Sequence, residues 1–319
     1  MSILLDENTN VLIQAITGQQ GQIDLRRMQR CGTKVVAGVT HGKGGQEVMG
    51  VPVYNTVADA QKDHRIDAVM SYVPRQRAKE AALEVARAGV PMMGISAERI
   101  PIHDLAHLLA ETKRLGTRIV GPNMLGIVSS GRALMGGIGG ENPTRTLLRG
   151  PVGIMSKSGG MGAELCWTLT RAGIGQSTYV SLGGEPLSGM SFRDGLELFQ
   201  ADPETKVVIM FGEAGTRYEE EAADFIKNRG ITKPVLAFIV GRFTESLPGV
   251  RFGHGGTIIE AGTGTPSAKI KALENAGVTM MRRLIDLPAV IREKLGGAPE
   301  RWSPPVETKL QTAAAGRNS

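Results

Sequence analysis

The feature that most constrains this chain is a regular alternation of short apolar runs with amphipathic helical patterns. Helical patterns cover residues 77–88, 162–172, 218–228 and 267–276. Strands that alternate with helices predict βαβ units and parallel sheets, so all-α and all-β folds are excluded. We expect strands at residues 11–16, 34–39, 68–73, 92–95 and 119–120, and again at 152–155, 178–181, 207–211, 235–239 and 278–281.

The chain is long enough for two domains. It has 319 residues, and a domain takes about 150. The alternation restarts after a turn-rich stretch at residues 144–151. We therefore predict an α/β protein with two doubly wound domains, residues 1–145 and 146–296. Residues 297–319 contain three prolines and a polar end, and we expect a disordered tail there.

Composition limits the partners and the compartment. The net charge of +6 is spread along the chain, without a run of five basic residues, and aromatic residues are only 4%. This balance suits a small anionic ligand and argues against nucleic acid. No apolar stretch approaches the roughly 18 residues of a membrane span. Cys31 and Cys166 fall in different halves, which favours a reducing, cytoplasmic setting over a disulfide framework.

The first glycine-rich turn predicts an anion-binding site. Strand 11–16 runs directly into Thr17-Gly18-Gln19-Gln20-Gly21, and a helical pattern follows. A helix that begins after such a turn offers free backbone N–H groups and the positive end of its dipole to a phosphate. A tight turn without a ligand is the alternative, because Gly-x-x-Gly is only part of the dinucleotide fingerprint.

The end of the second strand discriminates among phosphorylated ligands. A Rossmann domain that binds NAD carries an acidic residue there for the ribose hydroxyls. This chain instead has Lys43, in His41-Gly-Lys-Gly-Gly45. A lysine neutralises phosphate, which favours coenzyme A over NAD and leaves NADP open. The other strand ends of this domain, where ligands bind in open α/β sheets, place further candidates at Pro74, Ser96, Ala97, Glu98 and Asn123.

The second domain repeats the pattern of strand, glycine turn and helix. Ser156 or Ser158 can cap the helix that follows, and Gly159 and Gly160 leave its first N–H groups open to an anion. Glu213 follows the end of another strand, where open α/β sheets bind their ligands, so its carboxylate is a candidate catalytic group. The acidic residues 219–221, in the first turns of the next helix, are expected to complement the helix dipole.

One histidine stands out. His254 lies in Gly253-His-Gly-Gly256, and the glycines on both sides leave its imidazole sterically open. An accessible imidazole with a carboxylate partner can act as a nucleophile toward phosphorus. We predict no metal site: His103 and His107 have the spacing of a zinc helix but lack an evident third ligand.

Taken together, these motifs resemble the α subunit of succinyl-CoA synthetase over about residues 1–295. The resemblance rests on the turns that begin at Thr17, Gly42, Gly121, Ser156, Gly212 and Gly253, in that order. It implies an N-terminal Rossmann-like CoA-binding domain and a C-terminal flavodoxin-like ligase domain. It also implies CoA contacts from Thr17, Gly18, Gln19, Gln20, Lys43 and residues 96–98, transient phosphorylation of His254, and a steadying role for Glu213.

The resemblance further implies a partner. Nothing in this sequence resembles an ATP-grasp domain, which the family carries on a β subunit that binds ATP or GTP with magnesium. The resemblance thus implies a phosphoprotein that acts in the tricarboxylic acid cycle and is active only as a hetero-oligomer. The reaction would form an acyl-CoA thioester from a carboxylic acid, by way of a phosphohistidine and an acyl phosphate.

The ligase turn departs from the family at the acid-binding position. The family reads Ser-Arg-Ser-Gly-Thr-Leu-Thr-Tyr-Glu there, and its tyrosine is assigned to the acid; this chain has Ala163 in place of that tyrosine. The glycine-rich turn is closer to ATP-citrate lyase and citryl-CoA synthetase. Succinate, malate, citrate and related acids therefore remain open. Two other functions stay in contention: a non-catalytic CoA or acyl-CoA sensor and an NAD(P)-dependent dehydrogenase.

Overall fold

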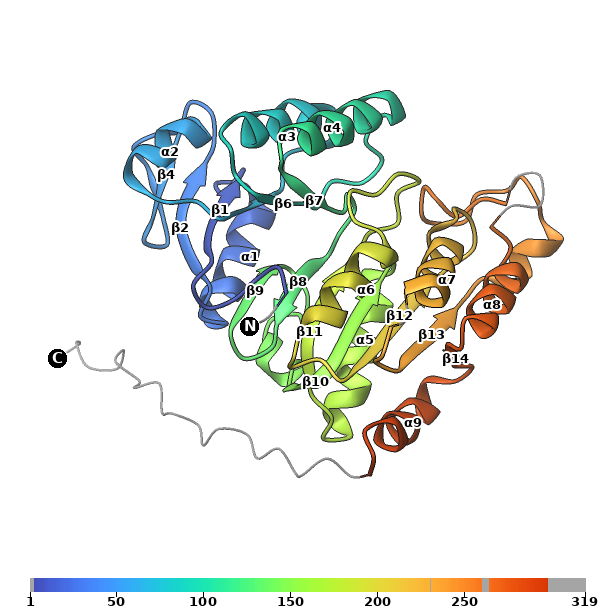
Figure 1. The fold of residues 1–319 in the computed structure, drawn as a ribbon. Coiled ribbons are helices and arrows are strands. Elements are labelled where there is room, and N and C mark those ends of the chain that lie inside the picture. Colours follow the sequence, from blue (N-terminus) through green and yellow to red (C-terminus); the bar gives the residue numbers. More distant parts are fainter. Residues whose placement is uncertain (1–2, 230, 260–263, 298–319) are drawn as a thin grey trace.

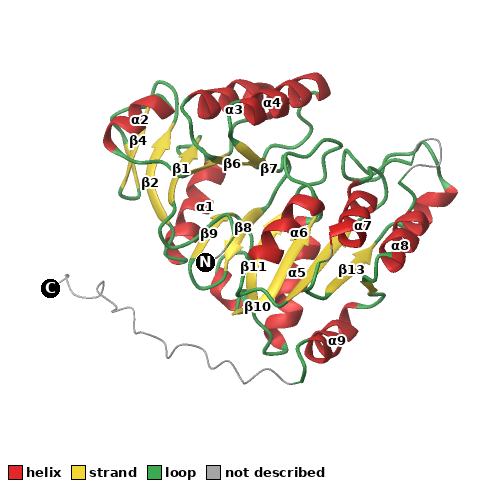
Figure 2. Ribbon diagram, viewed as in Figure 1, coloured by secondary structure: helices red, strands yellow, loops and turns green. Residues whose placement is uncertain are grey.

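Two sheets, one in each half of the chain, organise the molecule (Figure 1). The computed structural model describes residues 3–229, 231–259 and 264–297. The predicted tail at 297–319 therefore lies outside the described residues, apart from Gly297. Figure 2 shows helices on the faces of both sheets, as parallel strands require.

The first sheet has the order of a Rossmann domain. Its strands run β3-β4-β2-β1-β5-β6-β7, and β3 alone pairs antiparallel, at the edge. Without β3, the parallel strands follow the order 3-2-1-4-5-6 of dinucleotide-binding folds. The strands are β1 (Asn10–Gln14), β2 (Lys34–Val39), β3 (Glu47–Val48), β4 (Val51–Tyr54), β5 (Ala68–Ser71), β6 (Met92–Ile95) and β7 (Arg118–Val120).

Helices cover both faces of this sheet. One apolar core joins it to α2 (Val57–Asp63), α3 (Ala78–Arg87) and α4 (Ile102–Arg114). On the other face, α1 (Gln19–Arg30) contributes Leu25 and Met28 to a core that continues into the second domain. Thr33, just after α1, donates to the Leu134 carbonyl oxygen at 2.7 Å. Helix α1 is therefore packed between the two sheets.

The second sheet confirms the flavodoxin-like prediction. Its order is β14-β13-β12-β10-β11-β8-β9, and its parallel strands follow the pattern 2-1-3-4-5 of flavodoxin-like folds. The antiparallel hairpin β8-β9 is added beside β11. The strands are β8 (Gly126–Ser129), β9 (Ala133–Gly136), β10 (Arg149–Ser156), β11 (Gln176–Ser181), β12 (Val207–Gly212), β13 (Val235–Ile239) and β14 (Thr279–Met280).

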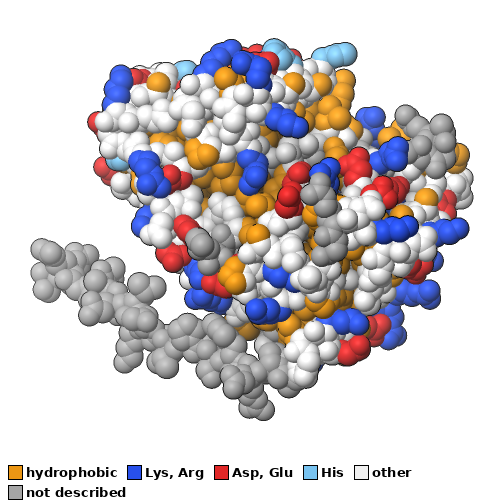
Figure 3. Space-filling model, in the orientation of Figure 1, with side chains coloured by type: hydrophobic (Ala, Val, Ile, Leu, Met, Phe, Trp, Pro, Cys, Tyr) orange, Lys and Arg blue, Asp and Glu red, His pale blue; other side chains and the backbone are white. Residues whose placement is uncertain are grey.

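The remaining helices belong to this second half. The α-helices are α5 (Gly159–Arg171), α6 (Phe192–Ala201), α7 (Tyr218–Arg229), α8 (Pro266–Asn275) and α9 (Leu287–Lys294), and short 3₁₀ helices occur at Arg75–Arg77, Pro143–Arg145, Arg242–Ser246 and Leu284–Asp286. None of the helices in the described residues is long and apolar enough to span a membrane. On the face drawn in Figure 3, acidic and basic side chains are interspersed, and hydrophobic side chains gather along the boundary between the two domains.

All ten expected strands are present, but the sequence missed two hairpins. Strands β3 and β4 are short, and β8 and β9 are four residues each. Because β8 already pairs with β11, the chain enters the second sheet at Gly126, well before the expected boundary at residue 145. Helix α1 begins at Gln19, inside the glycine turn, and α5 begins at Gly159, earlier than the expected pattern at 162.

Candidate active site

The candidate site lies where the central strands of the second sheet end. Strand β10 runs between β11 and β12, so the loops that follow these strands meet at one edge of the sheet. Strand order reverses between β10 and β12, and open α/β sheets bind ligands at such a point. Lys157 follows β10, Gly184 lies in the loop after β11, and Glu213 follows β12.

His254 and Glu213, predicted separately, form a direct pair. The Nδ1 of His254 is 2.8 Å from Oε2 and 3.0 Å from Oε1 of Glu213. Since a carboxylate only accepts, Nδ1 carries the proton and Nε2 keeps its lone pair. The histidine side chain is 30% exposed and the glutamate side chain 9%. The imidazole is thus held on one nitrogen and remains accessible.

The electrostatics of the pair favour a basic imidazole. The hydrogen bond that Nδ1 donates to the Glu213 carboxylate raises the pKa of His254 above its usual value, against the opposing effect of partial burial. The ammonium of Lys157 lowers the pKa of His254, and the carboxylate of Glu185 raises it. His254 therefore becomes neutral, and nucleophilic, only above the pH expected of a free histidine.

The loop that carries His254 is docked onto the loop after β11. The Gly256 N–H donates to the Gly184 carbonyl oxygen at 2.9 Å. The imidazole lies so close to Gly184 that a Cβ built there would be 2.2 Å from its Cγ. A Cβ on Gly215 would similarly be 2.0 Å from the Gly256 carbonyl oxygen. Glycines at these two positions allow the loop to reach Glu213.

A buried lysine borders the pair. The ammonium of Lys157 is 3.7 Å from Oε1 of Glu213 and donates to the Thr216 hydroxyl at 3.2 Å. It also lies 5.2 Å from the centre of the Tyr218 ring, and its side chain is only 2% exposed. The carboxylate of Glu213 thus contacts both the imidazole of His254 and the ammonium of Lys157. The sequence showed Lys157 as part of the ligase turn but gave it no role.

A second buried lysine, missed at the sequence level, supports Glu213 from behind. Lys269 of α8 is fully buried and binds Glu219, Glu220 at 2.9 Å, and the Thr216 carbonyl oxygen at 3.1 Å. Glu219 in turn accepts from the Glu213 N–H at 3.2 Å. Glu219, Glu220 and Glu221 do lie in the first turn of α7, as expected of residues that complement the helix dipole, but Glu219 and Glu220 have a further role that was not predicted. Their carboxylates pair with a lysine more than forty residues away in sequence.

The start of α5 lies just after the end of β10, between the strands that precede Gly184 and Glu213. Ser158 is its N-cap and accepts from the Met161 N–H at 3.3 Å, whereas the Ser156 hydroxyl is buried and donates to the Ser158 carbonyl oxygen at 2.6 Å. Gly160 is exposed, with open space where a side chain would point. His254 contacts the loops after β11 and β12, the two strands that flank β10, and α5 begins just after β10. Gly159 and Ala163 are half-buried within α5.

The first glycine turn lies between β1 and the N-terminus of α1. The hydroxyls of Thr17 and Thr40 are 3.3 Å apart and link the ends of β1 and β2. Gly18, Gln19 and Gln20 are exposed at the first turn of α1. Gly21 differs, because it is buried and a Cβ there would be 2.6 Å from the Ala15 carbonyl oxygen. Gly21 therefore allows α1 to pack close to β1 rather than facing a ligand.

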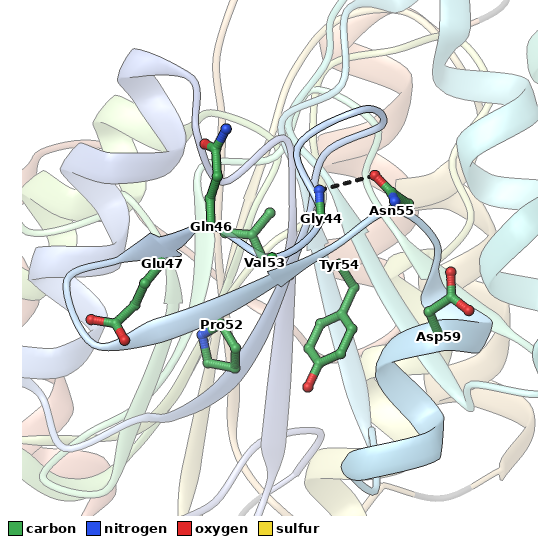
Figure 4. Close-up of a pocket in the computed structure, with 9 residues that line it drawn as sticks. Gly44, Gln46, Glu47, Pro52, Val53, Tyr54, Asn55 and Asp59 are labelled. Carbon is green, nitrogen blue, oxygen red and sulfur yellow. Dashed lines mark hydrogen bonds between the residues drawn. The ribbon is translucent and has the colours of Figure 1, made fainter.

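Lys43 is exposed at the tip of a well-ordered turn. Its N–H donates to the Thr40 carbonyl oxygen at 3.0 Å. Next to it, the Gly44 N–H donates to Oδ1 of Asn55 at 2.9 Å, a bond drawn in Figure 4. This turn borders an open hollow of about 490 Å³ beside β3 and β4. The glycines on either side of Lys43 thus present its ammonium to solvent near the end of β2.

A larger cavity, of about 770 Å³, opens at the ends of β1, β2 and β5 beside α3. Pro74, predicted as a ligand contact, lines it, together with residues the sequence did not indicate, such as Gln14 and Arg77. Gln14 is 1% exposed; its Nε2 donates to the Ala81 carbonyl oxygen at 3.2 Å, and its Oε1 has no hydrogen-bond partner. A cavity of this size, with polar and apolar residues in its lining, is large enough for a ligand such as the adenine ring of CoA.

The other predicted contacts lie at the neighbouring strand ends. The Asn123 N–H donates to the Ala97 carbonyl oxygen at 2.9 Å, so the loops after β6 and β7 are joined. Ser96 and Ala97 are half-buried, and Glu98 is exposed. On α4, Asp104 between the two histidines is paired with Lys79 at 2.5 Å. The described residues contain no cluster of three or more potential ligands that could hold a metal ion.

Comparison with protein families agrees with the division of the chain. Residues 6–98 match the family described as CoA binding domain, and residues 155–279 match the family described as CoA-ligase. The CoA-binding match ends with residue 98, at the loop after β6. The CoA-ligase match begins in the last two residues of β10, ends at the first residue of β14, and includes Glu213 and His254.

Curated relatives are similar over nearly their whole length. The chain is 44% identical over 295 residues to a protein of Archaeoglobus fulgidus named succinate–CoA ligase [ADP-forming] subunit alpha 1, covering 92% of this chain and 99% of the relative. It is 44% identical to the succinate–CoA ligase [ADP-forming] subunit alpha of Methanothermobacter thermautotrophicus, covering 92% and 97%.

Solved structures share the fold at lower identity. ATP citrate lyase from Methanothrix soehngenii, in complex with citrate and coenzyme A, superposes with a TM-score of 0.85 at 23% identity, covering 96% of this chain and 54% of that chain. A dinucleotide forming acetyl-coenzyme A synthetase 1 from Ca. Korarchaeum cryptofilum gives 0.70 at 21% identity, covering 88% and 59%. This chain therefore corresponds to little more than half of each of these longer proteins.

Proposed function

This chain belongs to the family of succinate–CoA ligase α subunits, and we propose that it carries its phosphoryl group on His254. It is a CoA ligase subunit with a CoA-binding domain, and the naming of its relatives as α subunits implies a β subunit. The observation that carries the proposal is the contact of 2.8 Å between Nδ1 of His254 and Glu213, which leaves Nε2 accessible.

The first step transfers a phosphoryl group to the histidine. The Nε2 lone pair attacks the terminal phosphorus of a nucleoside triphosphate held by an ATP-grasp β subunit, and the diphosphate leaves. The nucleotide, ATP or GTP, and its magnesium belong to that partner. Glu213 holds the proton on Nδ1 and stabilises the positive charge that develops on the ring. Lys157, close to the same carboxylate, limits how far the imidazole is protonated before the reaction.

The second step uses the anion site at the start of α5. A carboxylate oxygen of the acid attacks phosphorus, the nitrogen–phosphorus bond breaks, and an acyl phosphate results. Its phosphate is stabilised by the free N–H groups of Gly159 and Gly160 and by the helix dipole. Ser158 shapes this end of α5 as its N-cap. Ser156 supports that turn from below, through its bond to the Ser158 carbonyl oxygen.

The third step forms the thioester. The CoA sulfur, as thiolate, attacks the acyl carbon, and inorganic phosphate leaves. We assign the adenine half of CoA to the cavity lined by Gln14 and Pro74, and its phosphates to Lys43 and the start of α1. Residues 96–98 and Asn123 lie at the strand ends beside this cavity, on the path toward the second domain. Positioning by both domains supplies most of the catalysis in this scheme.

Two observations bear on which carboxylic acid is the substrate. The relatives are named for succinate, whereas the structure of ATP citrate lyase that shares this fold contains citrate. Ala163 of α5 offers a methyl group where the family pattern has a tyrosine. We propose a small carboxylic acid and would test succinate, malate and citrate in that order. A cytoplasmic location fits the two free thiols, Cys31 and Cys166.

The experiment combines labelling with an acid screen. The chain is co-expressed with its β subunit, incubated with ATP labelled in the γ-phosphate, and compared with the His254→Asn variant. We expect an acid-labile, base-stable label on the wild type alone, and phosphate release only when CoA and the right acid are both added. A CoA sensor would bind CoA in both proteins and take no label, and a dehydrogenase would bind NAD(P)H. Either result would refute the proposal.

A further inference from the structure

The loop after β11 belongs to the second domain and packs against the first. Its residues 183–190, here called the bridge segment, follow β11 and precede α6. The Gly189 N–H donates to the Gly121 carbonyl oxygen at 2.9 Å, at the end of β7 in the first domain. A Cβ on Gly183 would be 1.9 Å from the Pro122 carbonyl oxygen. The bridge segment is therefore packed tightly against the strand ends of the CoA-binding domain.

Within this segment, Glu185 holds a buried carboxylate that the reaction scheme does not use. It is only 4% exposed, and its Oε1 accepts from the Arg99 N–H at 2.6 Å. Arg99 directly follows Glu98 and has a φ of 56°, a left-handed conformation that is unfavourable for arginine. A charge-assisted bond to its N–H holds the loop after β6 in this conformation.

The same side chain faces the loop of His254. A Cβ on Gly255 would be 3.0 Å from Oε2 of Glu185, and one on Gly256 would be 3.1 Å from the Glu185 carbonyl oxygen. The Gly256 N–H binds the adjacent Gly184. Glu185 therefore lies between residues 96–99 of the first domain and residues 254–256 of the second. It contacts the loop proposed for CoA with one oxygen and borders the histidine loop with the other.

We propose that Glu185 is a positioning residue that aligns the CoA-binding loop with the docked histidine loop for the thioester step. The inference rests on the proposed function and deepens it. In that step the bond between sulfur and the acyl carbon forms while the bond between that carbon and the phosphate oxygen breaks. Its rate depends on the relative placement of two loops from different domains. Phosphorylation of His254 uses the partner's nucleotide and does not require that alignment.

The experiment measures the two half-reactions separately, in the complex with the β subunit. Phosphorylation is followed with labelled ATP in the absence of CoA and acid. The thioester step is followed as formation of acyl-CoA from the phosphorylated complex after CoA and acid are added, whereas label lost from His254 with the acid alone reports the preceding acyl-phosphate step. Succinate is the first probe, and otherwise the acid that the wild type uses fastest. The variants are Glu185→Ala, which removes the carboxylate, and Glu185→Gln, which keeps an oxygen for the Arg99 N–H.

The control variant removes a contact between the domains far from the site. Thr33→Val deletes the hydroxyl that donates to the Leu134 carbonyl oxygen at 2.7 Å and accepts from its N–H at 2.9 Å. Thr33 precedes β2, at the opposite edge of the sheet from the ligand-binding ends. This change weakens the domain contact as the Glu185 variants do but leaves the bridge segment intact. Midpoints of thermal unfolding are measured for all variants.

We expect Glu185→Ala to slow the thioester step roughly 10- to 100-fold, the effect of a misplacement of about 1 Å. At alkaline pH, where His254 is neutral with or without the charge of Glu185, phosphorylation should keep the wild-type rate. Glu185→Gln should recover most of the loss in the thioester step, and Thr33→Val should leave both half-reactions intact. A parallel loss of both half-reactions in Glu185→Ala, or a wild-type rate for its thioester step, would overturn the inference. If the wild type itself takes no label, the proposed function fails instead.

Discussion

Replacement of Glu213 by glutamine isolates the charge of the carboxylate that holds His254. The amide keeps the size of the side chain and one acceptor, but the two contacts of 2.8 and 3.0 Å lose their charge. Hydrogen bonds to charged groups contribute about 1.5–3 kcal/mol and neutral ones about 0.5–1.5 kcal/mol. The difference, about 1–1.5 kcal/mol, corresponds to a phosphorylation rate about 5- to 13-fold lower at high pH.

The pH dependence of this variant has a definite sign. The carboxylate raises the pKa of His254, and only the neutral imidazole attacks phosphorus. The wild-type rate should therefore rise as the pH passes that raised pKa and then level off. In Glu213→Gln the pKa of His254 falls, so the rise moves to lower pH while the plateau drops. The deficit of the variant should consequently shrink as the pH is lowered.

The assay is the initial rate of label incorporation from ATP, measured in the complex with the β subunit between pH 5.5 and 8.5. Glu220→Gln serves as the matched control, because Glu220 shares Lys269 with Glu219 but has no contact with Glu213. Its profile should coincide with that of the wild type. A Glu213→Gln profile that keeps the wild-type midpoint and plateau would refute the assigned role of this carboxylate.

Three further changes test neighbouring parts of the site. Gly184→Ala places a Cβ 2.2 Å from Cγ of His254 and should lower phosphorylation at least tenfold with an unchanged unfolding midpoint; a wild-type rate would contradict the docked position of the ring. Lys269→Met removes the cationic partner of Glu219 and Glu220 and should lower the free energy of unfolding by about 3–5 kcal/mol in denaturant titrations. A change below about 1 kcal/mol would show that the ion pair of Lys269 with Glu219 is not buried as described. Burial raises the pKa of the Cys166 thiol, and it raises the pKa of the Cys31 thiol to about 11. Both thiols should therefore react with a thiol reagent at pH 7.5 far faster after unfolding. Rapid modification of Cys166 in the folded protein would argue against its burial.

Much of the fold could be read from the sequence because periodicity is a local property. Apolar runs of two to six residues predicted the parallel strands, and glycine turns predicted where helices begin. The hairpin of β8 and β9 escaped because its strands are short and their partner, β11, lies about fifty residues later. The boundary between the sheets was accordingly expected too late in the chain.

The sequence predicted which residues of the site end a strand or lie in a glycine-rich turn, but not which charged residues are buried around them. His254 and Glu213 stood out because one lies among glycines and the other ends a strand. Lys269, Glu219 and Glu185 did not, since a charged residue in a helix or turn is usually solvated, and only the tertiary structure shows that these three are buried. The close packing of Gly21 could not be predicted for a related reason, because it depends on the position of Ala15 in the tertiary structure.

The direct test of the central assignment is the identity of the phosphorylated atom. The complex is labelled uniformly with nitrogen-15, phosphorylated with ATP and examined by phosphorus and nitrogen NMR at alkaline pH. A single coupling between phosphorus and Nε2 of residue 254, absent from His254→Asn, is the predicted result. A phosphoryl group on Nδ1, which Glu213 engages here, or on any other residue, would contradict the account.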